Sequence, residues 1–214
     1  AQCNLFAEVD QRMAEYIQRF LGVPFDYARH LQKSYYRQFG TTLAGMMKVH
    51  NMDPTGFLAY VHEIDLSPVP ESPELRAAIA RLPGRRLIFT AGSHRHAERV
   101  AGKLGILDLF EDIVDIVDSG FLPKEKAESY DRLIASHGVT PRECAMFEDM
   151  PHNLEPAHLL GMTTVLVHST GHDHPVQQRI KSWTSVPEHI HHMTEDLTGF
   201  LDGIDLDGTG ERAT

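Results

Sequence analysis

Apolar residues in the first third of the chain recur every three or four positions, which is the spacing of one face of a helix. Four such stripes follow one another and predict helices at residues 5–21 and 27–40, and from residues 42 and 54 onward. Thr42 is the expected N-cap of the third helix, and Asp53 followed by Pro54 is a favourable start for the fourth. The pattern therefore predicts a bundle of helices whose apolar stripes form its core.

The hydrophobic pattern changes after the proline-rich segment at residues 67–73. Short apolar runs at residues 87–89, 113–117, 144–147 and 163–167 alternate there with helical stripes. Apolar strands that alternate with helices are typical of a parallel sheet with helices on both faces. The sequence thus predicts an α/β protein with a helical domain over residues 1–66, an α/β domain over residues 67–201 and a flexible tail over residues 202–214.

Composition and charge narrow the range of functions. The 214 residues include 30 acidic and 20 basic side chains, a formal net charge of −10, which disfavours a surface that binds nucleic acid by neutralising phosphates. No apolar run approaches the roughly 20 residues of a membrane-spanning helix, and no basic and apolar leader opens the chain. The two cysteines form no disulfide framework, so a cytoplasmic protein is expected. Several of the 14 histidines cluster late in the chain at irregular spacing, which favours surface positions over a zinc site.

Ligands of parallel α/β sheets bind at the carboxyl ends of the strands, and three of these ends carry polar residues. Thr90 follows the first apolar run, Lys124 lies in the loop after the second, and Glu148-Asp149 follows the third. Taken singly, a turn hydroxyl, a loop lysine and an acidic pair at a helix start are common structural features. Their occurrence at successive strand ends is the more specific signal.

Together these side chains suit a phosphoryl group and a divalent cation. The Thr90 hydroxyl and the backbone N–H groups of Ala91 and Gly92 can hold phosphate oxygens ahead of a helix. The Lys124 ammonium offsets the negative charge that develops on a phosphoryl group during transfer. The acidic pair provides the oxygen ligands that Mg²⁺ prefers.

The order of these residues resembles the haloacid dehalogenase superfamily. The family's second motif is an apolar strand ending in Thr or Ser, its third is a loop lysine, and its fourth is an apolar strand ending in an acidic pair. The corresponding phrases are Leu87-Ile88-Phe89-Thr90, Pro123-Lys124 and Met146-Phe147-Glu148-Asp149. Longer phrases are similar to the pyrimidine 5′-nucleotidase-like branch, among them Tyr35-Tyr36-Arg37-Gln38-Phe39-Gly40 and Gly161-Met162-Thr163-Thr164-Val165.

This resemblance covers the chain from about Asn4 to Leu201 and implies a Rossmann-like core with an N-terminal helical cap that closes over the substrate. It implies Mg²⁺-dependent hydrolysis of a small phosphate monoester, such as a pyrimidine nucleoside monophosphate. Thr90 and Lys124 would be the catalytic and phosphate-binding residues, and the acidic pair Glu148-Asp149 would hold the metal.

The chain departs from the family pattern at two of these places. Ala91 follows Thr90 where the family often has Asn, which removes one hydrogen-bonding side chain. Lys126 lies close enough to Lys124 to compete for the lysine role. Lys124 is the preferred candidate because it follows Pro123, as in the family.

The family's first motif, Asp-x-Asp at the end of a first central strand, has no counterpart ahead of the helices, so this strand and the nucleophile are expected to be missing. A similar phrase, Asp205-Leu206-Asp207-Gly208-Thr209, lies in the predicted tail; it is interpreted as a polar tail, with replacement of the first motif as the alternative. Two other functions stay open: a non-catalytic phosphate-binding or regulatory protein, and a carbon–halogen hydrolase, which in this family works without Mg²⁺. The oligomeric state stays open as well.

Overall fold

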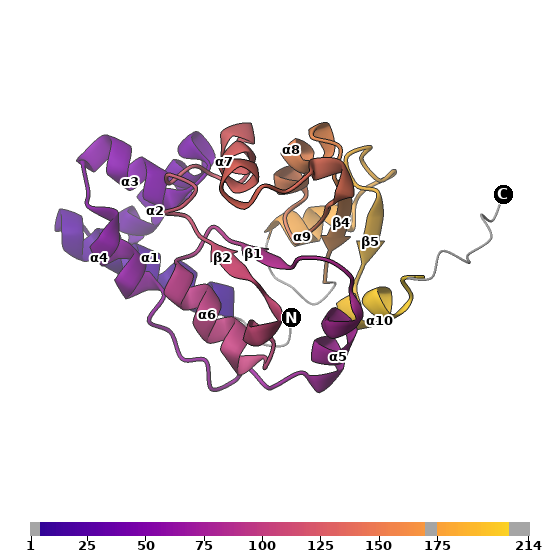
Figure 1. Cartoon of the computed structure of the whole chain (residues 1–214). Coiled ribbons are helices and arrows are strands. Elements are labelled where there is room, and N and C mark those ends of the chain that lie inside the picture. Colours follow the sequence, from indigo (N-terminus) through magenta and orange to yellow (C-terminus); the bar gives the residue numbers. More distant parts are fainter. Residues whose placement is uncertain (1–4, 170–174, 206–214) are drawn as a thin grey trace.

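The computed structural model describes residues 5–169 and 175–205 and has an α/β architecture (Figure 1). Four helices gather at one end of the molecule, coloured indigo and purple in Figure 1, and are called the helical half. They are α1 (Leu5–Leu21), α2 (Phe25–Phe39), α3 (Thr42–His50) and α4 (Pro54–Val61). The predicted helical first third is confirmed, and the boundary at residue 66 stays a prediction.

Polar caps fix where two of these helices begin. Asp53 caps α4 through its side chain, as expected, with a proline at the first helical position. The predicted cap of α3 is wrong by one residue, because Thr41 accepts the hydrogen bond from the Ala44 N–H at 3.0 Å. The hydroxyl of Thr42 is instead buried and donates to the Gln32 carbonyl at 3.2 Å, which ties α3 to α2.

The apolar stripes of the helical half meet in one cluster. Its buried members include Val9, Ile17, Tyr35, Met46, Phe57 and Val61. Residues from the rest of the chain join it: Ile116 is buried within the cluster, and Val100, Leu104 and Phe121 pack against it. The helical half therefore shares its core with the α/β half.

The α/β half alternates strands and helices as the sequence predicts. Its helices are α5 (Pro73–Arg81), α6 (His94–Lys103), α7 (Ala127–His137), α8 (Leu154–Leu159), α9 (Pro175–Ile180) and α10 (Leu197–Asp202). Its strands are β1 (Leu87–Phe89), β2 (Asp112–Val114), β3 (Ala145–Glu148), β4 (Thr163–Val167) and β5 (His192–Thr194). Short 3₁₀ turns cover Leu107–Leu109, Pro141–Glu143 and Pro151–Asn153. No helix in residues 5–169 and 175–205 is both long and apolar enough to cross a membrane.

All strand pairs are parallel, as predicted, but the strands form two sheets, β1-β2 and β3-β4-β5. β2 ends at Val114 rather than continuing to Val117, because the Asp115 carboxylate accepts the Val117 and Asp118 N–H groups at 2.8 and 3.0 Å and closes a turn. β5 was not predicted, because its His-Met-Thr sequence contains no apolar run.

β1 and β3 are joined through side chains rather than by a backbone ladder between them in the described residues. Ile88 and Phe147 contribute to one apolar cluster with α5, α6 and α10, whereas Phe89 and Met146 pack on the opposite side with α7 and α8. Helices therefore cover both faces of the strands, as expected. All three residues of β1 are only partly buried, whereas three consecutive residues of β4 are buried. β1, which lies beside the boundary between the two sheets, is therefore the more exposed to solvent.

Candidate active site

Lys124 connects the carboxyl ends of β1 and β3. Its ammonium donates to the Phe89 carbonyl at 3.1 Å and forms an ion pair with the Glu148 carboxylate. Only 10% of the Lys124 side chain and 5% of the Glu148 side chain are exposed. Lys126, the competing lysine, is exposed at the start of α7, so the structure brings Lys124 and not Lys126 to the strand ends.

Thr90 lies directly after β1 and begins a tight loop. Its N–H donates to the Val114 carbonyl at 2.9 Å, and its hydroxyl oxygen accepts the Gly92 N–H at 3.0 Å. The Gly92 carbonyl accepts the Ile116 N–H at 3.2 Å, so the loop is fixed at both ends to the neighbouring strand and turn. Ala91 is exposed at the tip of the loop. The Lys124 ammonium donates to the carbonyl of Phe89, the residue before Thr90, so the ammonium and this loop lie together at the carboxyl end of β1.

Glu148 and Asp149 lie next to each other at the end of β3. The second Glu148 oxygen, Oε1, accepts the Asp149 and Met150 N–H groups at 3.0 and 3.2 Å. Burial alone would raise the pKa of Glu148, but Lys124, a hydrogen bond shared with Asp149 and the Met150 amide lower it to about 2.

The carboxyl group of Asp149 behaves in the opposite way. Although the residue reaches the surface, protein atoms crowd its carboxyl group, and this loss of hydration together with the adjacent Glu148 raises the pKa of Asp149 to about 7. The two carboxyl groups therefore lie close enough to share one proton. The side-chain amide of Gln177 donates to the Asp149 carbonyl at 2.6 Å and fixes the backbone behind the pair.

The helical half covers this edge from α2. A Cβ atom placed on Gly40 would lie 2.7 Å from both Glu125 Oε1 and Pro123 Cγ, so the end of α2 touches the loop that carries Lys124. Tyr36 lies one helical turn earlier. Partial burial, and next the carboxylates of Glu125, Asp149 and Glu148, raise the pKa of Tyr36, which places its hydroxyl in the field of the acidic pair.

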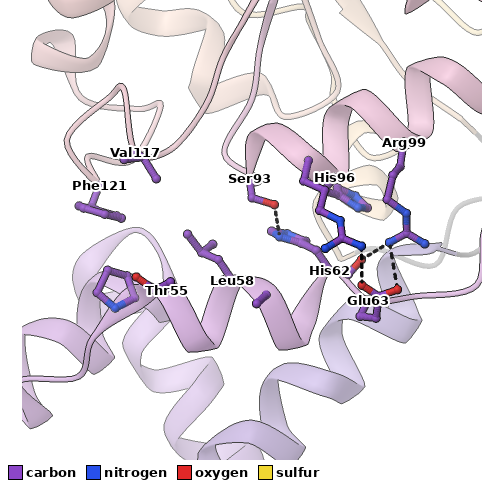
Figure 2. A pocket seen from close by; sticks show the side chains of 12 residues that line it. Thr55, Leu58, His62, Glu63, Ser93, His96, Arg99, Val117 and Phe121 are labelled. Atoms are coloured by element: carbon purple, nitrogen blue, oxygen red, sulfur yellow. Dashed lines mark hydrogen bonds and ion pairs between the residues drawn. The ribbon is translucent and has the colours of Figure 1, made fainter.

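A second group of polar residues lies where α4 meets α6 (Figure 2). His62 follows α4, and its Nδ1 lies 3.0 Å from the Ser93 hydroxyl oxygen. The His62 ring stacks on His96 with centroids 4.5 Å apart and an angle of 16° between the rings. The Arg99 guanidinium donates to the carbonyls of His62 and Ile64 at 2.9 and 3.0 Å, which clamps the end of the helical half onto α6.

The structure thus brings together Thr90, Lys124 and the acidic pair, which the sequence predicts as one site. It also brings His62, Ser93 and Arg99 together where α4 meets α6, a group that the sequence analysis did not single out. Their sequence signal is weak, because a lone histidine after a helix and a serine before one are common features of helix ends. Only the hydrogen bonds between the two halves mark them out.

Acid is expected to destabilise the protein through His62. Burial, and next the neighbouring His96, lower the pKa of His62 from 6.5 to about 4. Because the unfolded chain then binds the proton more tightly, the free energy of unfolding should fall by up to about 3 kcal/mol as the pH drops from 6.5 to 4. Urea unfolding across this range measures the slope. The variant His62→Phe, which keeps a ring over His96, should flatten most of it, and an equal slope in both proteins would contradict the assignment.

Comparisons with known proteins bear on the fold and the family of this chain. A family model described as haloacid dehalogenase-like hydrolase matches residues 6–161. A haloacid dehalogenase-type phosphatase from Thermococcus onnurineus is similar to this chain with a TM-score of 0.59 and 16% identity, over 92% of this chain and 89% of that one. A magnesium-bound hydrolase of the same type from Bacillus subtilis gives 0.55 and 13% over 92% and 91%. L-2-haloacid dehalogenase from Xanthobacter autotrophicus gives 0.51 and 13% over 90% and 91%.

At these identities the solved structures establish a common fold, and the family model covers most of the chain. The Rossmann-type core predicted from the strand pattern is thereby confirmed. The chain belongs to the haloacid dehalogenase-like hydrolase family.

Proposed function

We propose that this chain is the binding framework of a Mg²⁺-dependent phosphate monoester hydrolase. One observation carries the proposal: the nearly buried Lys124 ammonium joins the end of β1, beside Thr90, to the acidic pair at the end of β3. A cation, a hydroxyl in a tight loop and two carboxylates at the ends of two strands are the groups that phosphoryl transfer requires.

Each residue has a distinct part in this proposal. The Thr90 hydroxyl and the N–H group of Ala91 bind the non-bridging oxygens of the phosphate, and the Gly92 N–H, which donates to the Thr90 hydroxyl oxygen, holds that hydroxyl in place. Lys124 places its charge against the phosphoryl group and is itself held in position by Glu148. The helical half lies above this edge through α2 and excludes water from it.

The acidic pair fits Mg²⁺. Both oxygens of Glu148 already accept hydrogen bonds from Lys124 and from backbone amides, whereas the Asp149 carboxyl group competes with Glu148 for a single proton. A divalent cation would relieve that competition, and Mg²⁺ commonly takes only one or two protein carboxylates together with water and a substrate phosphate. Asp149 would bind the ion directly, with Glu148 beside it. When bound, Mg²⁺ would neutralise the phosphate charge during transfer.

A pyrimidine nucleoside monophosphate is the proposed substrate class, on the strength of the sequence resemblance. The phosphatase from Thermococcus onnurineus and the magnesium-bound hydrolase from Bacillus subtilis have the same fold, and so does a haloacid dehalogenase. The acidic pair favours the metal-dependent phosphatase chemistry over carbon–halogen hydrolysis, because the latter needs no Mg²⁺ in this family.

Magnesium and phosphate are expected to stabilise the protein together. At ~100 times the dissociation constant, inorganic phosphate with Mg²⁺ should raise Tm by about 5 °C, because the ligand binds only the folded chain. Asp149→Asn should remove the Mg²⁺-dependent part of this shift, whereas Asp131→Asn, at an exposed position of α7, should keep it. Differential scanning fluorimetry with Mg²⁺ or chelator measures both. A phosphate shift that is identical in chelator would exclude the metal.

Turnover needs a nucleophile, and the family's Asp-x-Asp motif, which would supply it, is expected from the sequence to be missing ahead of the helices. Residues 1–4 and 206–214 lie outside the described residues, including most of the phrase that begins at Asp205. A chain with an apolar strand ending in Asp-x-Asp joined ahead of Leu5 should hydrolyse p-nitrophenyl phosphate only with Mg²⁺. Phosphate binding without hydrolysis in that protein would favour the alternative of a non-catalytic phosphate-binding protein.

A further inference from the structure

The segment that carries Lys124 is held by the helical half on both sides of that residue. Pro123 is buried at the end of α2, and a Cβ atom on Gly40 would lie 2.7 Å from both Pro123 Cγ and Glu125 Oε1. Ahead of these contacts, the Phe121 side chain packs against the apolar cluster of the helical half. It does so beside a pocket of about 300 Å³ between α4 and α6 (Figure 2). Two helices of the helical half, α2 and α4, therefore contact this segment.

The Lys124 side chain, in contrast, is held by the other half of the protein. Its ammonium donates to the Phe89 carbonyl at 3.1 Å, lies 5.3 Å from the centroid of the Phe89 ring and is paired with the Glu148 carboxylate. These contacts all belong to the ends of β1 and β3. Because a lysine side chain is long and flexible, they depend on a backbone that is fixed at a suitable distance from the strand ends.

Phe121 has an unusual backbone conformation for its residue type. Apart from glycines, only Asn51 and Phe121 of the described residues have a positive φ, at 50° and 61°. Asparagine tolerates this left-handed region, whereas a bulky aromatic residue adopts it only where surrounding contacts compensate. Gly120, with φ of 66°, precedes Phe121, and the Phe121 N–H donates to the Ile116 carbonyl at 2.8 Å. The contact of the ring with the helical half is the compensation that the structure offers.

We propose that Phe121 is a positioning residue that couples the packing of the helical half to the position of Lys124. With the helical half in place, the Phe121 ring and the contact between Gly40 and Pro123 fix the segment, and the ammonium reaches the strand ends. Without the ring, the left-handed backbone is no longer compensated, so the turn relaxes and the ammonium moves away from Glu148. The inference rests on the proposed function only for the phosphate that Lys124 would bind.

Chemical labelling of Lys124 tests this coupling without any ligand. The folded full chain is acetylated with a water-soluble active ester, and each lysine is followed by mass spectrometry. Lys124 should react slowly in the wild type because only 10% of its side chain is exposed, whereas exposed Lys126 reacts quickly. Phe121→Ala should accelerate labelling of Lys124 at least ~10-fold through local opening and leave Lys126 unchanged. Phe121→Tyr keeps the ring and should keep the wild-type rate.

Two further variants separate positioning from a general loss of stability. Val9→Ala removes buried volume from the same apolar cluster, but in α1, and should leave the labelling of Lys124 unchanged. Gly40→Ala acts on the second contact, because its methyl group would collide with Pro123. It should therefore accelerate labelling of Lys124 as well, which keeps the test decisive if Phe121→Ala fails to fold.

A wild-type labelling rate of Lys124 in Phe121→Ala, or in Gly40→Ala should the former not fold, would overturn the proposal. An equal acceleration by Val9→Ala would also overturn it. Isothermal titration calorimetry of methylphosphonate with Mg²⁺ adds the link to the proposed function: Phe121→Ala should bind ~10-fold more weakly, and Phe121→Tyr as tightly as the wild type. If no protein binds methylphosphonate while the labelling result holds, the proposed function fails and the positioning role of Phe121 stands.

Discussion

Replacing Lys124 by methionine should lower the free energy of unfolding by about 3–5 kcal/mol, although the side-chain volume hardly changes. The substitution leaves the Glu148 carboxylate in a buried position with its counter-charge removed. Breaking one partner of a buried ion pair is far more costly than breaking an exposed pair, because the remaining charge has lost its hydration without compensation. Exposed Arg85 and Glu111 provide the contrast: Arg85→Met should change the free energy of unfolding far less, because both charges are hydrated.

The Lys124→Met substitution should also reverse part of the pH dependence of the free energy of unfolding. In the wild type the pKa of Glu148 is lowered to about 2, so its contribution to stability is present above pH 4.5 and is lost as the pH falls toward 2. Without Lys124, burial should outweigh the hydrogen bonds that Glu148 keeps with Asp149 and the Met150 amide, and the pKa of Glu148 should rise above 4.5. Stability in the variant should then decrease as the pH rises through that value.

Chemical denaturation at several pH values measures both effects. The double variant Lys124→Met with Glu148→Gln removes the buried charge and should recover most of the lost stability at pH 7. If the single and double variants were equally unstable at pH 7, the lost stability would come from altered packing and not from the unpaired charge of Glu148.

Gly45→Ala should destabilise the protein by about 1–3 kcal/mol, even though alanine is the better helix former. A Cβ atom on Gly45 would lie 2.4 Å from the Tyr35 Cβ and 2.6 Å from its Cγ, so α2 and α3 would have to move apart. Tyr35 is buried and its hydroxyl oxygen lies 2.7 Å from His50 Nε2, which leaves it little freedom to yield.

Gly102→Ala is the matched control. Gly102 lies inside α6, and a Cβ atom there would meet nothing within 4 Å, so the same substitution should stabilise by roughly 0.5–1 kcal/mol through helix propensity. The midpoint of thermal or urea unfolding compares the two variants. Shifts of the same sign at both positions would show that the close approach of α2 and α3 does not govern the result.

The elements that could be predicted from the sequence are those that a periodic pattern of apolar residues or a local capping signal defines. The helical stripes, the cap at Asp53 and the strands at residues 87–89 and 163–167 follow from spacing alone. Thr90, Lys124 and the acidic pair could be placed at one edge because parallel strands bring their carboxyl ends together. The family resemblance then gave each residue a role, which the structure leaves for experiment.

The remaining features depend on contacts between distant segments, which no local pattern records. Asp115 ends β2 early because its side chain bonds to nearby amides and to the N–H of His94, 21 residues away in the chain. The pocket that His62 lines exists only where α4 meets α6, and the sequence of neither helix shows that it packs against the other. The resemblance already favoured Lys124 over Lys126, but the contact between Lys124 and the Phe89 carbonyl could not be predicted from it.

The apolar cluster that contains Ile116 limits how a substrate can enter. Swinging the helical half away as a rigid lid would expose Ile116 together with the side chains of Val100, Leu104 and Phe121 to water. Each fully buried side chain of this size costs about 1.5–3 kcal/mol to hydrate, so a wide hinge opening would be rare. We expect access to the strand ends to depend on sliding of packed helices by small shear displacements, with Arg99 and the His62 carbonyl as the fixed point.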